Sequence, residues 1–210
     1  MDMLHIVDHP IVSHNLTIMR DAATTSAEFR SRLRTIAALL AYEASRDLPV
    51  RTASVTTPVS TASLPMLDQR PITVVPILRA GMGMVDGVLA MLPHAAVGFI
   101  GMERDETTFQ PMEYYCKMPA NVADSLVYVI DPMLATGGSA ADALTRLKER
   151  GCQDLRMLCI VAAPEGVRAL QQTHPDVAIY TASLDDGLTE TAYITPGLGD
   201  AGDRIFATVV

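Results

Sequence analysis

The chain has 210 residues, of which 49% are hydrophobic, and its formal net charge is -8. This length is enough for one compact domain with a sizeable core, so residues 1–210 are predicted to form a single domain. The acidic balance argues against a nucleic-acid partner, because phosphate contacts need clustered Lys and Arg. No apolar stretch reaches the roughly 18–20 residues of a membrane helix, which argues against a membrane partner.

The chain has three cysteines, and their spacing indicates no disulfide pairing. This odd number, together with an amino terminus that lacks a signal-peptide pattern, predicts a cytoplasmic protein. Cys152 and Cys159 are expected in the core. The five histidines show none of the spacings typical of metal ligands, so the sequence predicts no dedicated metal site.

Residues 25–47 are predicted to form a helix that begins with a capping box of Thr25 and Glu28. One face of this helix is apolar and should pack on the core, and it carries Phe29, Leu33, Ile36, Leu40 and Ala44. The arginines of the helix are expected to face solvent, and these are Arg30, Arg32 and Arg34.

Two less regular segments flank this helix. Residues 1–24 have mixed polarity, and Asn15 is interpreted as a surface residue. Residues 50–68 are rich in Thr, Ser and Val, with prolines at Pro58 and Pro65, which predicts short strands in a hairpin arm. Such an arm would pack on another subunit, so we expect a homo-oligomer, at least a dimer.

The remaining chain alternates between apolar strands and helices. The predicted strands are 72–78, 95–101, 126–131, 155–163 and 177–183, with a further hairpin strand at 111–117. The predicted helices are 84–92, 140–150 and 167–173. This alternation predicts an α/β fold: a doubly wound, mostly parallel five-stranded sheet flanked by helices, with a small β-arm and a carboxyl-terminal hood.

The turn that follows the strand 126–131 has the features of a phosphate cradle. Asp131 stands at its entrance, and two hydroxyl residues flank a glycine pair at its exit, namely Thr136, Gly137, Gly138 and Ser139. A glycine pair lets several N–H groups point at one spot, and the next helix turns its positive end there. Asp131 is placed to hold ribose hydroxyls, so the ligand implied is a phosphorylated ribose.

Two other interpretations of the glycines were weighed. No P-loop pattern exists in the chain, and Gly81, Gly83 and Gly87 resemble a dinucleotide fingerprint whose third glycine is one residue late. Glycines at a junction between a strand and a helix also occur merely to turn the chain. The carboxylate of Asp131 favours the phosphate site over this second alternative.

The segment Val-Ile-Asp-Pro-Met-Leu-Ala-Thr-Gly-Gly-Ser resembles the phosphoribosyl diphosphate (PRPP) loop of type I phosphoribosyltransferases. Most members of that family have two adjacent acids here, whereas this chain has one, followed by proline, as in the uracil enzymes. The resemblance covers nearly the whole chain. It implies that PRPP is bound by Asp131, Pro132, Met133, Leu134, Ala135, Thr136, Gly137, Gly138 and Ser139.

Two arginines are candidates for holding the diphosphate of PRPP. Arg79 follows a central strand, at the end where α/β sheets bind ligands, although it could also pair with a surface acid. Residues 102–108 are charged and would form a lid over the site, unless they are a plain solvated loop. The resemblance implies that Arg104 of this lid reaches the diphosphate; Glu103 replaces an expected aromatic residue.

The glycine-rich stretch 193–204 would present bare backbone to a planar base. A loop that offers N–H, C=O and N–H groups matches the edge of uracil, whereas the amino group of cytosine would face a donor. The resemblance implies uracil contacts by Ile194, Gly199, Asp200 and Ala201, and a PRPP contact by Asp200 as well. The nearby Asp-Asp-Gly at 185–187 is interpreted as a turn rather than a metal site.

The function implied is transfer of the 5-phosphoribosyl group from PRPP to uracil, which gives UMP and diphosphate in pyrimidine salvage. Arg79, Arg104 and Asp131 would act by positioning and charge stabilisation, without a covalent nucleophile. Mg²⁺ would arrive bound to PRPP. The resemblance also suggests GTP as an allosteric activator. The rivals are a transferase for another base and a regulatory RNA-binding protein, which the net charge disfavours.

Overall fold

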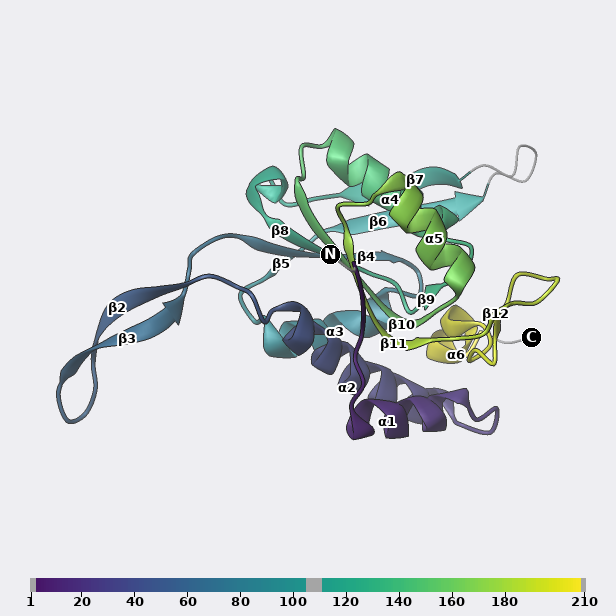
Figure 1. Ribbon diagram of the computed structural model, residues 1–210, viewed down its shortest axis with the longest axis horizontal. Helices are drawn as coiled ribbons and strands as arrows, with labels where there is room; N and C mark the ends of the chain where they lie inside the picture. The colour runs from purple at the N-terminus through teal and green to yellow at the C-terminus, as the bar shows by residue number, and fades with distance from the viewer. Residues whose placement is uncertain (1–2, 105–110, 209–210) are drawn as a thin grey trace.

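The computed structural model describes residues 3–104 and 111–208 of the chain. A nine-stranded sheet runs through the molecule (Figure 1), and its main path has the order β1-β11-β10-β8-β4-β6-β7. The short strands β5 and β9 pair with β4 and β10 beside this path. The strands are β1 (Leu4–Ile6), β4 (Ile72–Leu78), β5 (Ala96–Val97), β6 (Phe99–Arg104), β7 (Pro111–Lys117), β8 (Leu126–Ile130), β9 (Met133–Leu134), β10 (Asp154–Ala162) and β11 (Ala178–Leu184).

The pairs along this sheet are parallel, except that β6 and β7 form an antiparallel hairpin. The five apolar strands expected from the sequence are adjacent in the order β11-β10-β8-β4-β6, which confirms the predicted doubly wound sheet. At one edge lies β7, the predicted hairpin strand, and at the other edge the structure adds β1. Because parallel strands share one direction, their carboxyl ends lie along one edge, where open α/β sheets bind ligands.

Helices cover both faces of the sheet, as Figure 1 shows. Their bounds are α1 (Pro10–Arg20), α2 (Ser26–Ala44), α3 (Met82–Met91), α4 (Gly138–Glu149), α5 (Pro164–Thr173) and α6 (Ala201–Phe206). Buried residues of α1, α2, α3 and α6 form one core with the sheet, and those of α4 and α5 form a second core on the other face. Within the described residues, no helix combines the length and apolar character needed to cross a bilayer.

The central strands β4 and β8 are buried along almost their whole length because both faces of the sheet are covered. Successive side chains of a strand point to opposite faces. In β8, Tyr128 and Ile130 therefore belong to the first core, and Val127 and Val129 to the second. Both cysteines expected in the core are buried, with Cys152 and Cys159 in the second core.

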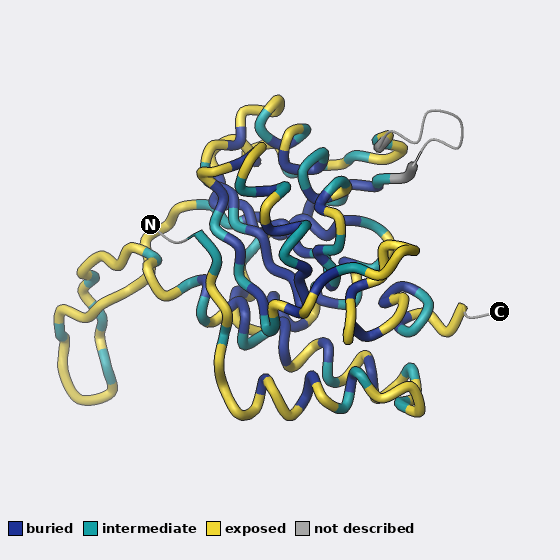
Figure 2. Tube along the Cα trace, turned by 45° about the vertical axis from the view of Figure 1, so that its right-hand side comes forward, coloured by how far each residue is buried: buried dark blue, intermediate teal, exposed yellow. Residues whose placement is uncertain are grey.

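The predicted arm is an antiparallel hairpin of β2 (Val50–Thr56) and β3 (Thr61–Leu67). It projects from the body of the molecule in Figure 1, and Figure 2 shows it as mostly exposed. The exposed residues of the arm include large apolar side chains, namely Val50, Val59, Leu64, Met66 and Leu67. The hairpin forms a sheet of two strands by itself, apart from the central sheet.

The carboxyl-terminal segment 187–206, here called the hood, adds a small sheet and a helix. The strands β12 (Gly187–Leu188) and β13 (Ile194–Thr195) pair antiparallel, and α6 follows. Figure 1 shows the hood beyond the carboxyl ends of β10 and β11. The glycine-rich stretch predicted to read a base therefore lies at the ligand-binding edge of the sheet.

The first 24 residues contain β1 and α1, neither of which the sequence analysis predicted. His9 caps the start of α1, where its Nδ1 atom accepts a hydrogen bond of 3.1 Å from the Ile11 N–H. Asn15 is not a surface residue, since only 4% of it is exposed. Its amide donates to the Ile11 carbonyl at 2.7 Å and accepts from Arg32 at 3.4 Å.

The helix α2 begins as predicted, and of its three arginines Arg30 and Arg34 are exposed as expected, whereas Arg32 is half-buried. The Glu28 N–H donates to the Thr25 hydroxyl at 3.3 Å, which confirms half of the capping box. The Glu28 carboxylate instead pairs with Arg32 at 2.9 Å. Arg30 reaches across to α6 and donates to the Ile205 carbonyl at 2.7 Å, because the hood packs against α2.

Tyr128 fastens the end of α2 to the sheet. It is the largest fully buried side chain, and its hydroxyl donates to the Ala44 carbonyl at 3.2 Å. Burial raises the pKa of this phenol to about 12, so the group remains a donor at neutral pH. Arg156 of β10 donates to the same carbonyl and pairs with both carboxylate oxygens of Asp47, at 2.6 and 3.0 Å.

Substitution of Tyr128 by Phe removes only this hydroxyl. We expect the free energy of unfolding, measured by urea denaturation, to fall by about 0.5–1.5 kcal/mol, since Arg156 still satisfies the Ala44 carbonyl. Tyr180→Phe is the control, because Tyr180 is half-buried and stacks on His5 at 4.6 Å. It should cost less than about 0.5 kcal/mol. Equal losses in the two variants would contradict the role of the Tyr128 hydroxyl.

Candidate active site

The predicted phosphate loop, residues 131–139, connects β8 to α4 at the carboxyl edge of the sheet. Gly137 caps α4 with a φ of 85°, in the left-handed region that costs other residues roughly 1–2 kcal/mol. A Cβ atom there would also lie 3.0 Å from the Gly166 carbonyl oxygen. This turn directs the first N–H groups of α4 and the positive end of the helix into the loop.

The loop encloses a cavity of about 80 Å³, whose lining consists of Asp131, Met133, Leu134, Ala135, Thr136, Gly137, Gly138, Ser139 and Ala140. A single water needs roughly 10–15 Å³ by the same kind of measure, so the cavity has room for a larger anion. Eight of the nine loop residues predicted to bind PRPP line it, and the exception is Pro132. This proline is buried, and its carbonyl accepts from the Ile160 and Val161 N–H groups at 3.0 and 3.1 Å.

Asp131 lies directly after the last residue of β8, and its own N–H donates to the Leu158 carbonyl at 3.1 Å. Burial raises the pKa of its carboxyl group to about 7, and a long hydrogen bond of 3.5 Å from the Met133 N–H opposes this rise. Part of the residue remains accessible and lines the cavity. Strongly shifted pKa values in a cleft are typical of functional residues.

Arg79 lies in the turn between β4 and α3, and its side chain is exposed. A Cβ atom on Gly81 would lie only 2.4 Å from the Ile130 carbonyl oxygen, so glycine lets this turn pack on the end of β8. The turn is therefore a neighbour of Asp131. Arg79 forms no ion pair with the described side chains, which weakens the alternative of a surface ion pair.

The four residues of the hood that are predicted to contact uracil differ in exposure. Gly199, with a φ of 77°, and Asp200 are exposed, and the Asp200 carboxylate caps α6 by accepting from the Asp203 N–H at 2.9 Å. Ile194 and Ala201 are only 4% and 2% exposed, so their side chains belong to the core. These two residues can meet a ligand only through backbone groups.

The predicted site residues share one edge of the sheet without sharing one cavity. The Arg79 turn contacts the end of β8 at Gly81, and an ideal Cβ on Gly202 of the hood would lie 4.0 Å from the Cβ of Ala80 in that turn. The hood therefore lies beside the Arg79 turn, and this turn lies beside the end of β8, where the phosphate loop begins. The 80 Å³ cavity itself includes neither Arg79 nor any hood residue.

The predicted lid is only partly described. Arg104 is the last residue of β6 and pairs through its backbone with Pro111 of β7. Its side chain, that of Glu103, and residues 105–110, which hold the rest of the lid, lie outside the described residues. The proposed contact of Arg104 with diphosphate stays a prediction.

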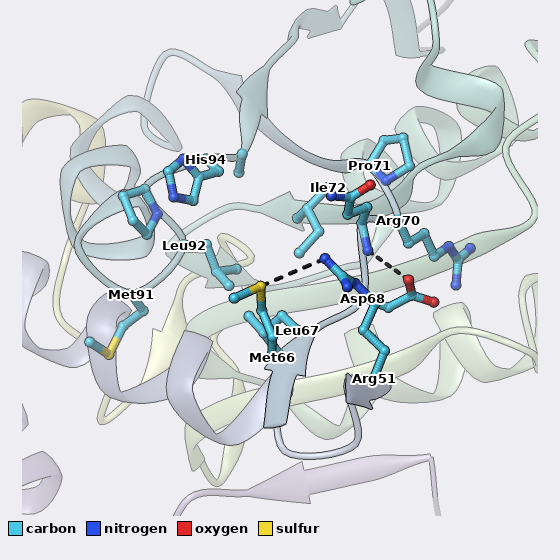
Figure 3. A pocket seen from close by; sticks show the side chains of 13 residues that line it. Arg51, Met66, Leu67, Asp68, Arg70, Pro71, Ile72, Met91, Leu92 and His94 are labelled. Carbon is cyan, nitrogen blue, oxygen red and sulfur yellow. Dashed lines mark hydrogen bonds between the residues drawn. The ribbon is translucent and has the colours of Figure 1, made fainter. Parts of the chain in front are cut away.

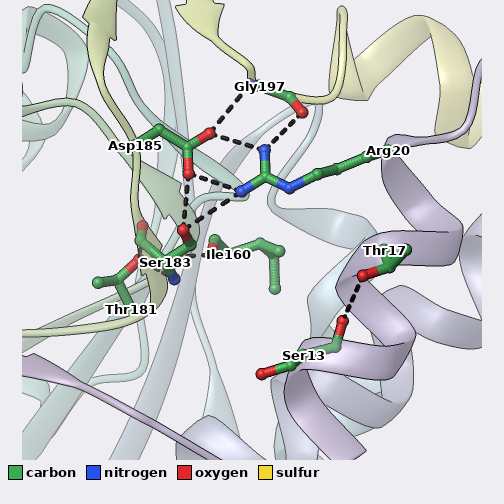
Figure 4. A network of polar contacts seen from close by, with 8 residues as sticks. All are labelled: Ser13, Thr17, Arg20, Ile160, Thr181, Ser183, Asp185 and Gly197. Atoms are coloured by element: carbon green, nitrogen blue, oxygen red, sulfur yellow. Dashed lines mark hydrogen bonds and ion pairs between the residues drawn. The ribbon is translucent and has the colours of Figure 1, made fainter.

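A polar network that no sequence pattern predicts joins α1 to the hood (Figure 4). Arg20 forms an ion pair of 2.6 Å with Asp185, which is a buried residue of the turn between β11 and β12. Burial alone would raise the pKa of Asp185, but hydrogen bonds from Arg20, Ser183 and Gly197 and the charge of Arg20 hold it below its usual value. The partners lie 165 residues apart, so no local spacing indicates their contact.

A larger cavity, of about 610 Å³, lies at the base of the arm (Figure 3). Its lining includes Pro71 and Ile72, where β4 begins, and Arg51 of the arm, which donates to the Met66 sulfur at 3.6 Å. This position is the amino edge of the sheet, whereas α/β sheets bind ligands at the carboxyl edge. No predicted site residue lines this cavity, so we do not assign the active site to it.

The chain matches known proteins along almost its entire length. The family model for uracil phosphoribosyltransferase matches residues 6–208. The chain is 54% identical to the uracil phosphoribosyltransferase of Clostridium beijerinckii over 96% of this chain and 97% of that protein. It is 50% identical to the enzyme of the same name from Exiguobacterium sibiricum, over 99% and 100% of the two chains.

Solved structures agree with this match. The AQ2163 protein from Aquifex aeolicus superposes with a TM-score of 0.92 at 33% identity and covers 99% of both chains. The adenine phosphoribosyl transferase from Trypanosoma brucei reaches a TM-score of 0.59 at 12% identity, which shows a shared fold alone. The family model and the full-length relatives together confirm the resemblance of the PRPP loop: the chain belongs to the uracil phosphoribosyltransferase family.

Proposed function

We propose that the protein transfers the 5-phosphoribosyl group from PRPP to uracil, which gives UMP and diphosphate, and that this reaction takes place at the carboxyl edge of the sheet. The observation that carries the proposal is the loop between β8 and α4. Its left-handed Gly137 turns the start of α4 toward a cavity that also contains the carboxyl group of Asp131. A phosphate site and a ribose site then lie within one loop, as the reaction of this family requires.

The 5′-phosphate would bind at the exit of the loop. The N–H groups of residues 136–139 precede or begin α4, and the first N–H groups of a helix have no partner within it. Thr136 and Ser139 are exposed at the cavity and add hydroxyl donors. A dianionic phosphate suits these donors and the positive end of the helix.

Asp131 would hold the ribose hydroxyls, with the backbone of residues 132–135 beside it. An ionised carboxylate is an acceptor at both oxygens, whereas a protonated carboxyl group carries one donor and accepts less well. Because burial places the pKa of Asp131 at about 7, a large fraction of the free protein carries a protonated group at neutral pH. Binding of the sugar would therefore favour the ionised form and release a proton.

The departing diphosphate would meet positive charge from Arg79 and Arg104. As the bond between C1 of the ribose and the diphosphate breaks, negative charge grows on the diphosphate, and fixed cations stabilise it. The rest of the catalysis would come from positioning of uracil against C1. We assign no covalent nucleophile, because the two substrates can react directly once they are aligned.

Mg²⁺ would accompany PRPP rather than occupy a protein cage. The described residues contain no cluster of three His, Cys, Asp or Glu side chains that could hold a metal ion. Asp131 in the cavity and the exposed Asp200 offer the oxygen ligands that Mg²⁺ prefers, so the site fits an ion shared with phosphate oxygens. When bound, Mg²⁺ would supply positive charge at the diphosphate.

Uracil would be read by the backbone between residues 194 and 201. Ile194 and Ala201 are buried and contribute backbone groups, while Gly199 and Asp200 are exposed at the surface of the hood. Alternating N–H and C=O groups match O2, N3–H and O4 of uracil. A buried donor facing the amino group of cytosine would remain unpaired, which is costly.

Three further features belong to this proposal. We infer a homo-oligomer in which the arm packs on a second copy, because an isolated two-stranded hairpin is marginally stable and this one exposes apolar side chains. The three free thiols are consistent with the cytoplasm. The family resemblance alone suggests GTP as an allosteric activator, and a rate that is unchanged by added GTP would remove that suggestion.

The choice of base can be tested by direct assay of product formation. With PRPP and Mg²⁺, uracil should give UMP, and omission of Mg²⁺ should abolish most of the rate. Cytosine, hypoxanthine and orotate should react more slowly by roughly 10⁴-fold, because each leaves a backbone group of the hood unpaired or clashes with it. Comparable turnover of any of these bases would contradict the proposed reading of uracil.

The role of the phosphate loop can be tested with two glycines that flank α4. Gly137 and Gly151 have φ angles of 85° and 89° at opposite ends of this helix, so alanine strains both positions by roughly 1–2 kcal/mol. Only Gly137→Ala should weaken PRPP binding, seen as a higher KM for PRPP. Gly151→Ala is the matched control, and an equal rise of that KM in both variants would show a general loss of stability instead.

The ionisation of Asp131 predicts a pH dependence. A carboxyl pKa raised to about 7 stabilises the folded state at low pH, and this contribution is lost as the pH rises toward and through 7. The free energy of unfolding of Asp131→Asn should lack this decline. Calorimetry of Mg²⁺–PRPP binding in buffers of different ionisation enthalpy should show proton release below pH 7 that is absent in Asp131→Asn. Identical proton release by both proteins would refute the assignment.

A further inference from the structure

Two arginines join the end of α1 to the hood. One comes from each segment, and each donates to backbone carbonyls of the other segment. Arg20 of α1 donates to the Gly197 carbonyl of the hood at 2.6 Å. Arg204 of α6 donates to the Leu198 carbonyl at 2.9 Å, and it crosses back to the carbonyls of Met19 and Asp21 at the end of α1. The hood is therefore fastened to a helix nearly 180 residues away in the chain.

Gly197 is clamped at both of its backbone groups, as Figure 4 shows. Its carbonyl accepts from Arg20, and its N–H donates to the Asp185 carboxylate at 2.9 Å. The same two side chains form a bidentate ion pair of 2.6 and 2.7 Å. The Ser183 hydroxyl donates to Asp185 at 2.7 Å, so one ion pair and one hydroxyl fix the backbone of one residue.

The clamp is buried and its geometry is demanding. The Asp185 side chain is 1% exposed and the Arg20 side chain 22%. Gly197 has a φ of 59°, and a Cβ atom there would lie 2.0 Å from the Ile194 carbonyl oxygen. The turn between Ile194 and Gly199 is thus closed on itself, and its orientation depends on the groups that hold Gly197 from outside.

We propose that Arg20 and Asp185 are positioning residues that set the backbone of residues 194–201 for uracil. This inference rests on the proposed role of the hood, and it adds how the hood acquires its shape. Neither residue is assigned a contact with uracil; they act through Gly197, three residues after Ile194 and two before Gly199. A buried ion pair adds little net stability but fixes a geometry when every polar group is satisfied, as it is here at the carboxylate.

The position of the hood affects the uracil reaction more than the binding of PRPP. PRPP contacts are assigned mainly to the loop between β8 and α4, which the clamp does not touch. A shift of about 1 Å in groups that position a substrate can cost on the order of 100-fold in rate. Damage to the clamp should therefore appear in the kinetic constants for uracil, not in the affinity for PRPP.

Two conservative variants test the clamp. In Asp185→Asn the amide NH₂ group faces an N–H of Arg20 in either orientation, and in one orientation it also faces the Gly197 N–H, so one or two hydrogen bonds are lost. In Arg20→Lys the planar fork that reaches Asp185 and Gly197 together is lost. We expect kcat/KM for uracil to fall by about 10- to 100-fold in both, mainly through KM, while the calorimetric Kd of Mg²⁺–PRPP is unchanged.

The ion pair between Arg156 and Asp47 provides a matched control. It is also bidentate, at 2.6 and 3.0 Å, and its arginine also donates to a backbone carbonyl, that of Ala44. It lies at the end of α2, away from the hood, and its carboxylate is more exposed. Asp47→Asn should lower the melting temperature and leave the KM for uracil and the Kd for Mg²⁺–PRPP unchanged.

The outcomes separate this inference from the function on which it rests. An unchanged KM for uracil in Arg20→Lys and Asp185→Asn, or an equal loss of PRPP affinity, would overturn the positioning role. If Asp185→Asn does not fold, Arg20→Lys decides alone. Gly199→Ala, which alters the proposed base-reading loop itself, tells the two failures apart: a normal KM for uracil in that variant would refute the hood as the uracil site.

Discussion

The left-handed turn at Gly137 fixes where the positive end of α4 points, and the candidate site is arranged around that direction. The carboxyl ends of β4, β8 and β10 lie side by side because the strands are parallel. The Arg79 turn packs on the end of β8 only because Gly81 has no Cβ atom. Positive charge, a carboxyl group and backbone donors thereby lie at one edge of the sheet. The proposed binding of PRPP requires these three kinds of group together.

The hood contributes to this edge from the other end of the chain. Its backbone conformation is not determined by its own residues alone, since Gly197 and Leu198 are held by arginines that connect them to α1. The first helix, which has no assigned contact with either substrate, thus takes part in shaping the proposed base site. The same helix buries Asn15 against Arg32 of α2, so its position is itself fixed by the first core.

Periodicity and local chemistry were sufficient to predict the five central strands, most helices and the turn between β8 and α4. Ile72–Leu78 and Leu126–Ile130 are apolar on both faces, and the glycine pair with Asp131 is a local pattern. The wrong expectations concern long-range contacts. Asn15 looks like a surface residue until α1 packs on α2, and the ion pair between Asp185 and Arg20 joins residues that lie 165 positions apart. No window of sequence contains both partners of such a contact.

A crystal structure of the protein with bound UMP would test the central claim most directly, because UMP carries the phosphate, the ribose and the base in one molecule. The account predicts its phosphate on the N–H groups of residues 136–139, its ribose hydroxyls on Asp131, and its uracil ring against the backbone of residues 194–201. A base that does not contact residues 194–201, for example one bound in the cavity at the base of the arm, would contradict the account.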